Sequence, residues 1–337
     1  MNNVILDNAE NICNNNDFCE LKGKTILITG ASGLIGSTFI ACLYYLKTIG
    51  YQIDVYAHTF SGFTPHISPL IKEGDFNILK TDLTDINIYS RLPEADMIIH
   101  AAGYAQPTRF LGNPVAALQI NTSATIALLK KLRKGGKFLF LSSSQVYCGL
   151  TKGLFSEEMI GTTTPFYSRA AYIEGKRSGE AICNSFRLSG VQAKVVRLGD
   201  IYGPGTRKHD KRALNNFIEK ALLHKRIDLL DSGNTAKTYC YITDAVELMW
   251  QVLLLGKEPV YNIGGRITYS IAELAKIIGR LTETDVFFPE KTKGIIGAPP
   301  VLQQDLTRID TEFHKVNYVD IEDGLRTTID WQRQLYD

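Results

Sequence analysis

A phenol, an amine and a hydroxyl in this sequence have the types and the spacing for acid–base chemistry. Tyr172 and Lys176 are four residues apart in a segment with helical character, and residues 142–144 are three consecutive serines after an apolar stretch. Residues four apart share a helix face, and a Lys ammonium beside a phenol lowers the pKa of the phenol by favouring phenolate. Such a phenol can act as a general base near neutral pH. Taken separately, the Tyr–Lys pair more often marks a helix surface, and the serines are typical of a polar loop.

A glycine-rich segment, residues 30–36 (Gly-Ala-Ser-Gly-Leu-Ile-Gly), comes between a β-branched apolar run at 25–29 and an apolar helical stretch at 34–46. Dinucleotide binding requires this context, because glycine lets the backbone approach the pyrophosphate and the helix N-terminus faces its negative charge. The spacing is G-x-x-G-x-x-G rather than G-x-G-x-x-G. The alternative is a glycine-rich turn that holds no ligand.

The residues do not select between NAD and NADP. An acid about 20 residues beyond the glycine segment would bind the ribose 2′-hydroxyl of NAD. Asp54 is near that distance, but it begins its predicted strand and therefore points the wrong way, and the strand ends with Ala-His-Thr at 57–59. Neither an acid nor an arginine follows there, and His58 is explained as well by a polar turn as by a cofactor role.

The elements that must position these groups alternate along the chain. Short apolar strands are predicted at 25–29, 53–57, 76–79, 96–100, 137–141 and 195–198, and long helices at 34–46, about 114–134 and 170–188. Alternating strands and helices indicate βαβ units, and strands without polar alternation indicate burial on both faces. We therefore predict an α/β fold, a Rossmann-type doubly wound parallel sheet with a smaller C-terminal substrate-binding region.

The alternation of strands and helices changes after Gly-Pro-Gly at 203–205. We divide the chain into an N-terminal arm (1–20), an NAD-binding Rossmann domain (21–203 plus about 237–263) and a substrate-binding region (204–236 and 264–337). Because the arm is rich in Asn and has little periodic pattern, we expect it to be loose or accessory.

The composition excludes several classes of protein. The 337 residues include 37 Lys plus Arg and 35 Asp plus Glu, and a net charge of +2 gives no basic footprint for nucleic acid. Six scattered cysteines without a CxxC pair or a nearby His at ligand spacing are typical of free thiols in a reducing compartment. Apolar runs are too short to cross a bilayer, and the first basic residue, Lys22, comes too late for a secretory signal. We expect a cytoplasmic protein without a membrane, nucleic-acid or metal partner.

Taken together, these residues resemble the extended short-chain dehydrogenases/reductases of the NAD-dependent epimerase/dehydratase type. The resemblance covers about residues 22–335. Its carriers are residues 30–36, 99–103 (Ile-His-Ala-Ala-Gly), 141–147 (Leu-Ser-Ser-Ser-Gln-Val-Tyr), 172–176 (Tyr-Ile-Glu-Gly-Lys), 197–205 (Arg-Leu-Gly-Asp-Ile-Tyr-Gly-Pro-Gly) and 261–265 (Tyr-Asn-Ile-Gly-Gly). It implies a nucleotide-sugar substrate, a tightly held NAD and transient oxidation at sugar C4. By analogy, we also expect a homodimer paired through the helices at 114–134 and 170–188.

The resemblance also implies roles for individual residues. Tyr172 is the expected base, Lys176 binds the nicotinamide ribose and tunes Tyr172, and Ser143 hydrogen-bonds the C4 oxygen, in the family's register three residues before Val146. The expected cofactor-binding residues are Gly30, Ser32, Gly33, Leu34, Ile35, Gly36, Asp82, Leu83, Ala101, Ala102, Gly103 and Asn121, together with Tyr172 and Lys176. The expected substrate-binding residues are Ser144, Gln145, Asp200, Arg207, Lys237 and Arg266.

Several positions depart from the family pattern. Ser144 and Gln145 replace the Asp-Glu pair of dehydratases and the Ser-Glu pair of decarboxylases, and neither side chain can carry a proton for elimination. Asp200 replaces an Asn that meets the substrate diphosphate, Lys237 replaces an Arg, and an expected Arg is missing just before Asp305. The diphosphate then needs other cations, and the candidates are Arg207, Lys208, Lys211, Arg212 and Arg266.

These residues favour an epimerase-type reaction, because hydride return needs only Ser143, Tyr172, Lys176 and NAD. The alternative is decarboxylation, since residues 169–180 are most similar to UDP-glucuronate decarboxylases. A third possibility is an NADPH-dependent reductase of a sugar or other carbonyl substrate, which is consistent with the missing ribose acid. A redox-sensing binder on an inactive fold is a fourth, but the intact Ser-Tyr-Lys set argues against it. We do not expect a 4,6-dehydratase.

Overall fold

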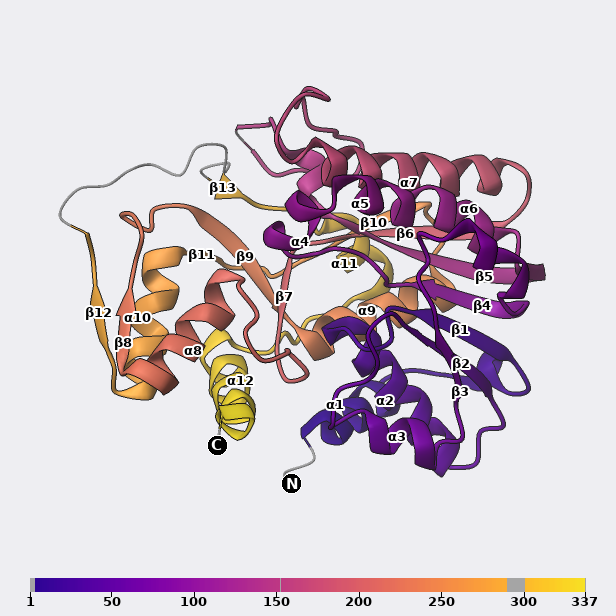
Figure 1. Ribbon diagram of the computed structural model, residues 1–337, viewed down its shortest axis with the longest axis horizontal. Coiled ribbons are helices and arrows are strands. Elements are labelled where there is room, and N and C mark those ends of the chain that lie inside the picture. The colour runs from indigo at the N-terminus through magenta and orange to yellow at the C-terminus, as the bar shows by residue number, and fades with distance from the viewer. Residues whose placement is uncertain (1–3, 152, 290–300, 337) are drawn as a thin grey trace.

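A seven-stranded parallel sheet forms the centre of the computed structural model, which describes residues 4–151, 153–289 and 301–336 (Figure 1). Its strands are β1 (Thr25–Thr29), β2 (Asp54–Thr59), β3 (Asn77–Lys80), β4 (Ala95–His100), β5 (Leu132–Ser143), β6 (Gln192–Leu198) and β10 (Val260–Ile263). Their order is β10-β6-β5-β4-β1-β2-β3, and each neighbouring pair is parallel. The direction in which strands are added reverses between β1 and β4, which is the doubly wound arrangement. The predicted Rossmann-type fold is confirmed.

Helices cover both faces of the sheet because successive strand residues point to opposite sides. Ile26 and Ile28 of β1 belong to one apolar cluster and Leu27 to the other, and all three are fully buried. The first face packs against α2 (Leu34–Thr48) and α9 (Ile242–Leu255). Helices α1 (Val4–Asn14) and α3 (Ser68–Glu73) belong to the same apolar cluster and pack on the outside of these helices. The second face packs against α5 (Pro114–Asn121), α6 (Ser123–Leu129) and α7 (Ala170–Leu188). This burial explains why the strands are continuous apolar runs in the sequence.

The other elements form a smaller region beside the sheet, at the left of Figure 1. Its central strand, β9 (Ala236–Tyr241), pairs with β7 (Asp200–Tyr202), β11 (Thr268–Ser270) and β13 (Val301–Leu302). Strand β8 (Arg226–Asp228) pairs with β12 (Asp285–Phe287), and this region also holds α8 (Ala213–His224), α10 (Ile271–Thr282) and α12 (Ile321–Tyr336). Short helices α4 (Pro107–Gly112) and α11 (Thr307–Phe313) pack against α5 and β10. Our division of the chain into domains stays a prediction.

Our prediction of one long helix at about 114–134 is wrong in the second half of that range. The structure has two helices, α5 and α6, which are separated at Thr122 by a non-helical backbone (φ −115°, ψ −80°), and β5 already begins at Leu132. Asn, Ser and Thr are poor helix formers because their side chains compete for backbone groups, and Thr122 Oγ1 donates to the Leu118 carbonyl. The helix expected at 170–188 is confirmed as α7.

The N-terminal arm is not loose, which corrects our expectation for residues 1–20. Residues Val4–Asn14 form helix α1, which buries Ile5, Ala9 and Ile12 against α2 and α9. These residues are four and three positions apart, the period of one helix face, but the intervening asparagines mask that period in the sequence. Just beyond the helix, Phe18 packs edge-on against Trp250 with ring centroids 5.2 Å apart.

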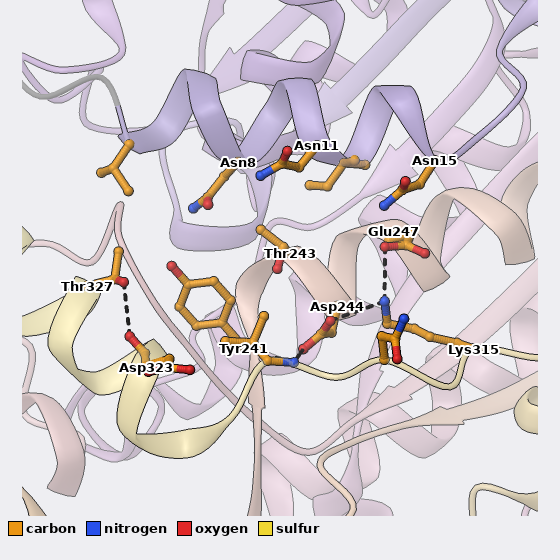
Figure 2. Close-up of a pocket in the computed structure, with 14 residues that line it drawn as sticks. Asn8, Asn11, Asn15, Tyr241, Thr243, Asp244, Glu247, Lys315, Asp323 and Thr327 are labelled. Carbon is orange, nitrogen blue, oxygen red and sulfur yellow. Dashed lines mark hydrogen bonds and ion pairs between the residues drawn. The ribbon is translucent and has the colours of Figure 1, made fainter.

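A polar pocket of about 470 Å³ lies between α1 and the start of α9 (Figure 2). Asn8, Asn11 and Asn15 of the N-terminal segment line one wall. On the other wall, the Lys315 ammonium lies 3.1 Å from the Asp244 carboxylate and 3.0 Å from that of Glu247. The residues that line this pocket include none of the predicted active-site residues.

The described residues agree with the thiol prediction and add one finding about membranes. All six cysteines are free thiols, as the scattered spacing predicted. In the ranges that the structure describes, no helix combines the length and the apolar character that crossing a bilayer requires.

Because α1 packs against the core through Ile12, which is only 1% exposed, we predict that shortening this side chain destabilises the protein. We expect Ile12→Ala to lower the free energy of unfolding by about 2–5 kcal/mol in denaturant titrations, because the substitution leaves a cavity in a packed core. The matched control is Asn11→Ala on the exposed side of the same helix, with an expected change within about 0.5 kcal/mol. Equal, small effects of both substitutions would contradict the docked helix.

Candidate active site

Helix α7 lies unusually close to the sheet and to α5, and this closeness positions the predicted catalytic pair. A Cβ atom on Gly179 would be 2.3 Å from the Phe140 ring of β5, and one on Gly175 would be 3.2 Å from the Ala117 carbonyl of α5. Only glycine fits at Gly179 without displacing its neighbour. Tyr172 and Lys176, on the same face of α7, are therefore held against the carboxyl end of β5, where both are buried.

A buried ion pair fixes α7 to strand β6 just behind that face. Arg197 of β6 is 2.8 Å from the Glu180 carboxylate, and its guanidinium also donates to the Tyr147 hydroxyl at 3.0 Å. Arg197 donates further to the carbonyls of Glu157 and Met159. We did not single out either partner from the sequence, although both lie in segments that carry the family resemblance.

The three consecutive serines differ in their hydrogen-bond partners. Ser142 Oγ donates to Glu180 at 2.5 Å and so belongs to the ion-pair network behind the site. Ser143, the last residue of β5, caps the short helix Ser144–Tyr147, accepts from the Gln145 N–H at 3.2 Å, and hydrogen-bonds the Tyr172 phenol. Ser144 is buried at the start of that short helix. The geometry thus brings Ser143 to Tyr172, and the catalytic role of Ser143 stays a prediction.

The phenol of Tyr172 is not acidified in this arrangement, contrary to what the Tyr–Lys spacing alone suggests. Burial raises the pKa of Tyr172 from its ordinary value, and the hydrogen bond from Ser143 opposes that rise. Asp200 raises the pKa further, and Arg212 lowers it. Its ring stacks on Phe110 of α4 with centroids 4.7 Å apart, a contact without any recognisable signal in the sequence.

Lys176 is buried on the sheet side of Tyr172. Its Nζ donates to the Leu141 carbonyl at 2.6 Å and lies 4.9 Å from the centre of the Phe140 ring. Burial lowers the pKa of Lys176 to about 8, while Glu180 opposes that shift. The ammonium form thus still predominates at neutral pH and can donate hydrogen bonds within the site.

The glycine-rich turn has the shape of a dinucleotide cradle. Gly30 has φ +67°, and a Cβ there would lie 2.7 Å from the Ala102 backbone, while one on Gly36 would lie 2.2 Å from the Gly30 carbonyl. Helix α2 begins after Gly33 without a side-chain cap, so its first N–H groups remain open to an anion. Gly103, after β4, faces the Lys176 ammonium, because a Cβ there would be 3.7 Å from Nζ. These residues fit a dinucleotide that runs from the α2 N-terminus toward Lys176.

The remaining residues that we predicted to bind the cofactor are buried or hydrogen-bonded to nearby backbone groups. Asp82 accepts from the N–H of Thr84 at 2.9 Å, and Leu83 is buried in the second core face. Asn121 donates to the Ala117 carbonyl, while its buried Oδ1 has no hydrogen-bond partner among the described residues. His58 is not a turn residue, which corrects one of our alternatives: it is a buried residue of β2 whose Nε2 lies 3.0 Å from the Thr81 carbonyl.

Two of the departures from the family pattern contact each other. The Lys237 ammonium of β9 is 2.9 Å from the Asp200 carboxylate of β7, and these two strands are paired. Each charge therefore neutralises the other. Half-buried Arg212 pairs with Asp210 at 2.7 Å, and its charge lowers the pKa of Tyr172.

The other substrate-binding predictions are not brought to Tyr172 by any contact described. Arg266 pairs with Asp310 and stacks over the Tyr318 ring, and Arg207 donates to Ser32 of the glycine-rich turn. Gln145 accepts a hydrogen bond from the Cys148 thiol. Among the residues that the structure describes, no group of His, Cys, Asp and Glu could hold a metal ion.

Comparison with known proteins identifies relatives of this chain. A model of the NAD dependent epimerase/dehydratase family matches residues 26–264. The chain is 28% identical over 320 residues to UDP-glucuronic acid decarboxylase 1 of Xenopus tropicalis, covering 92% of this chain and 72% of the relative. It is also similar to UDP-glucuronic acid 4-epimerase from Bacillus cereus, solved with UDP-glucuronic acid and NAD (TM-score 0.77, 25% identity, 93% of this chain, 100% of that chain). A dTDP-glucose 4,6-dehydratase from Streptomyces venezuelae, solved with NAD, shares the fold (TM-score 0.78, 22% identity, 92% and 97% coverage).

The position of Tyr172 predicts that its hydroxyl is essential for turnover. We expect Tyr172→Phe to lower turnover at least about 10²-fold, the low end for general acid–base catalysis, while bound cofactor measured by mass spectrometry is unchanged. The matched control is Tyr44→Phe, because that hydroxyl bonds Glu73 at an exposed site on α2. Near-normal turnover of the Tyr172 variant would remove this residue from its role.

The separation of the serines predicts different effects of their substitution. Because Ser143 hydrogen-bonds Tyr172, we expect Ser143→Ala to lose turnover and Ser144→Ala to keep most of it. To test this order, the initial rates of the two variants are measured with saturating substrate, and their melting temperatures are compared to show that both are equally well folded. The opposite order would place the catalytic hydroxyl one residue later.

Proposed function

The chain belongs to the NAD-dependent epimerase/dehydratase family, and from this premise we propose that it epimerises a nucleotide-activated sugar at C4. This family contains NAD-dependent enzymes that modify nucleotide sugars. The observation that carries the proposal is the meeting of Ser143 and Tyr172 at the carboxyl edge of β5, next to Lys176.

In the proposed reaction, Tyr172 moves the proton and Ser143 holds the reacting oxygen. The C4 hydroxyl gives its proton to the Tyr172 oxygen, which must first lose its own proton. Burial raises the pKa of this phenol, and the Lys176 ammonium together with the positively charged ring of NAD, when bound, would favour the phenolate. Ser143 hydrogen-bonds the C4 oxygen as it becomes a ketone. NAD, when bound, accepts the hydride that leaves C4 and supplies it again for the return. The sugar turns between the two half-reactions, and Tyr172 gives back the proton as the hydride reaches the opposite face of C4. The protons and the electrons balance without a further acid or base.

The charges around Tyr172 support a bound diphosphate better than the sequence alone suggested. Unpaired, Asp200 would repel a diphosphate, but Lys237 at 2.9 Å offsets its charge. Arg212 is a half-buried cation that pairs with Asp210 and lowers the pKa of Tyr172. A guanidinium matches phosphate geometry and is the cation that we assign to the substrate.

The two residues after Ser143 argue against elimination. A 4,6-dehydratase must take the C5 proton and protonate the departing C6 hydroxyl, which requires a positioned base and a positioned acid. Ser144 is buried, and the Gln145 amide accepts a hydrogen bond from the Cys148 thiol. Neither exchanges protons at useful rates near pH 7, so the C4 ketone is left to hydride return.

Decarboxylation is the second candidate, and the curated relatives favour it. Eight UDP-glucuronic acid decarboxylases are 26–28% identical to this chain. A C4 ketone is β to the C6 carboxylate of a uronic acid, so CO₂ can leave from the same oxidised species. Gln145 stands where that branch normally has Glu, and for this reason we place decarboxylation second.

The candidates give different products from one incubation. We expect the protein, incubated in deuterated water with UDP-glucuronate, UDP-glucose and dTDP-glucose in turn, to convert one of them into an isomer of equal mass without deuterium at C4. Loss of CO₂ with deuterium at C5 would show the decarboxylase, and a product lighter by one water would contradict both. The Tyr172→Phe variant serves as the control for background conversion.

A further inference from the structure

A guanidinium occupies the corner where the glycine-rich turn meets the end of β2. Arg207 Nη2 donates to Ser32 Oγ at 2.6 Å and to the Ser32 carbonyl at 3.0 Å, and Nη1 reaches Ser61 Oγ at 3.4 Å. Thr59 Oγ1, at the end of β2, is 3.0 Å from Ser32 Oγ. Three hydroxyls and one guanidinium thus converge from three segments of the chain.

This corner is positively charged without a described counter-ion. In the same loop, Arg212 pairs with Asp210 and Lys211 with Glu219, whereas the described contacts of Arg207 are to serine oxygens. Burial lowers the pKa of Arg207, and the neighbouring Arg109 lowers it further. Burial lowers the pKa of His66 to about 4, with Arg207 as the second cause, so this neighbour is neutral. The half-buried guanidinium therefore lacks the anion that such a site favours.

The corner lies where a doubly wound fold holds the adenosine ribose. The pyrophosphate sits at the N-terminus of the helix after β1, and the ribose at the carboxyl end of β2. There, an acid accepts from the 2′-hydroxyl of NAD, whereas an arginine accommodates the 2′-phosphate of NADP. In this chain β2 ends at Thr59, and the next residues are Phe60, Ser61 and Gly62, so the acid is absent from that position. His58 is buried and bonded to Thr81, and cannot replace it.

We propose that Arg207, with Ser32 and Ser61, binds the 2′-phosphate of NADP, so that this chain binds NADP at least as tightly as NAD. The relatives solved with NAD do not exclude this difference, because it concerns residues of this chain alone. Arg207 is the specificity-determining residue: it donates two N–H groups to a doubly charged phosphate, and the two hydroxyls donate beside it. The proposal does not depend on which product the enzyme forms.

Binding measurements without chemistry test the assignment. Protein freed of nucleotide is titrated with NAD, NADP, ADP-ribose and 2′-phospho-ADP-ribose by isothermal calorimetry. We expect each phosphorylated ligand to bind at least as tightly as its partner. We expect Arg207→Gln to weaken the phosphorylated ligands roughly 10- to 100-fold, the effect of one or two hydrogen bonds to a charged group, and the other two less than about 3-fold. Arg207→Lys should restore part of the loss.

A matched control separates the local effect from the loss of a charge. Arg187→Gln removes the same charge at an exposed position of α7, where the guanidinium donates to Asn184, and should leave all four affinities unchanged. Tighter binding of NAD than of NADP by the unmodified protein would overturn the proposal. Equal weakening of all four ligands by Arg207→Gln would overturn it too, because it would place Arg207 on the pyrophosphate. Failure here leaves the proposed epimerisation untouched, since that assay reports sugar products.

Discussion

The buried Glu180–Arg197 pair is the contact on which the geometry of the active site depends. It joins α7 to β6, and its hydrogen bonds extend to Ser142 of β5, to Tyr147 of the short helix after β5, and to the carbonyls of residues 157 and 159. Asn262 of β10 enters the same network through the Tyr147 hydroxyl. Removing one partner of a buried pair leaves an uncompensated charge, which costs about 3–5 kcal/mol. The network therefore holds Ser143 and Tyr172, which come from different elements, at one point.

The substrate side of the site shows how two unfavourable substitutions become compatible. Asp200 alone would place a carboxylate near the Tyr172 phenolate, and Lys237 alone would be a cation without a partner beside β7. In the parallel pairing of β7 and β9, Asp200 lies opposite Tyr239, so Lys237 is its diagonal neighbour two residues earlier, and the long Lys237 side chain reaches the carboxylate. The result is a neutral patch beside the base, while Arg212 lowers the pKa of Tyr172.

Local features of the sequence were sufficient for the sheet, for α7 and for the glycine-rich turn. Their signals are short: an apolar run, a G-x-x-G-x-x-G spacing, and a Y-x-x-x-K pair on one helix face. Features that depend on distant contacts could not be predicted in the same way. Arg207 and Ser32 are 175 positions apart, and no pattern near either residue indicates the other. The break at Thr122 and the packing of α1 could not be predicted for the same reason. Both segments contain poor helix formers, so their helices can be recognised only from the contacts that they make.

The packing of Trp250 sets an order in which this chain can finish folding during synthesis. Trp250 of α9 is fully buried between Phe18, just after α1, and Phe39 of α2, with ring centroids 5.2 and 4.9 Å away. Until residue 250 has left the ribosome, both phenylalanines lack this partner, and the inner face of α1 lacks its contacts with α9. Such exposed apolar surface on a long nascent chain is prone to aggregation and is typical of segments that chaperones hold. Helix α1 is thus made well before α9 and completes its packing only after α9 has been made.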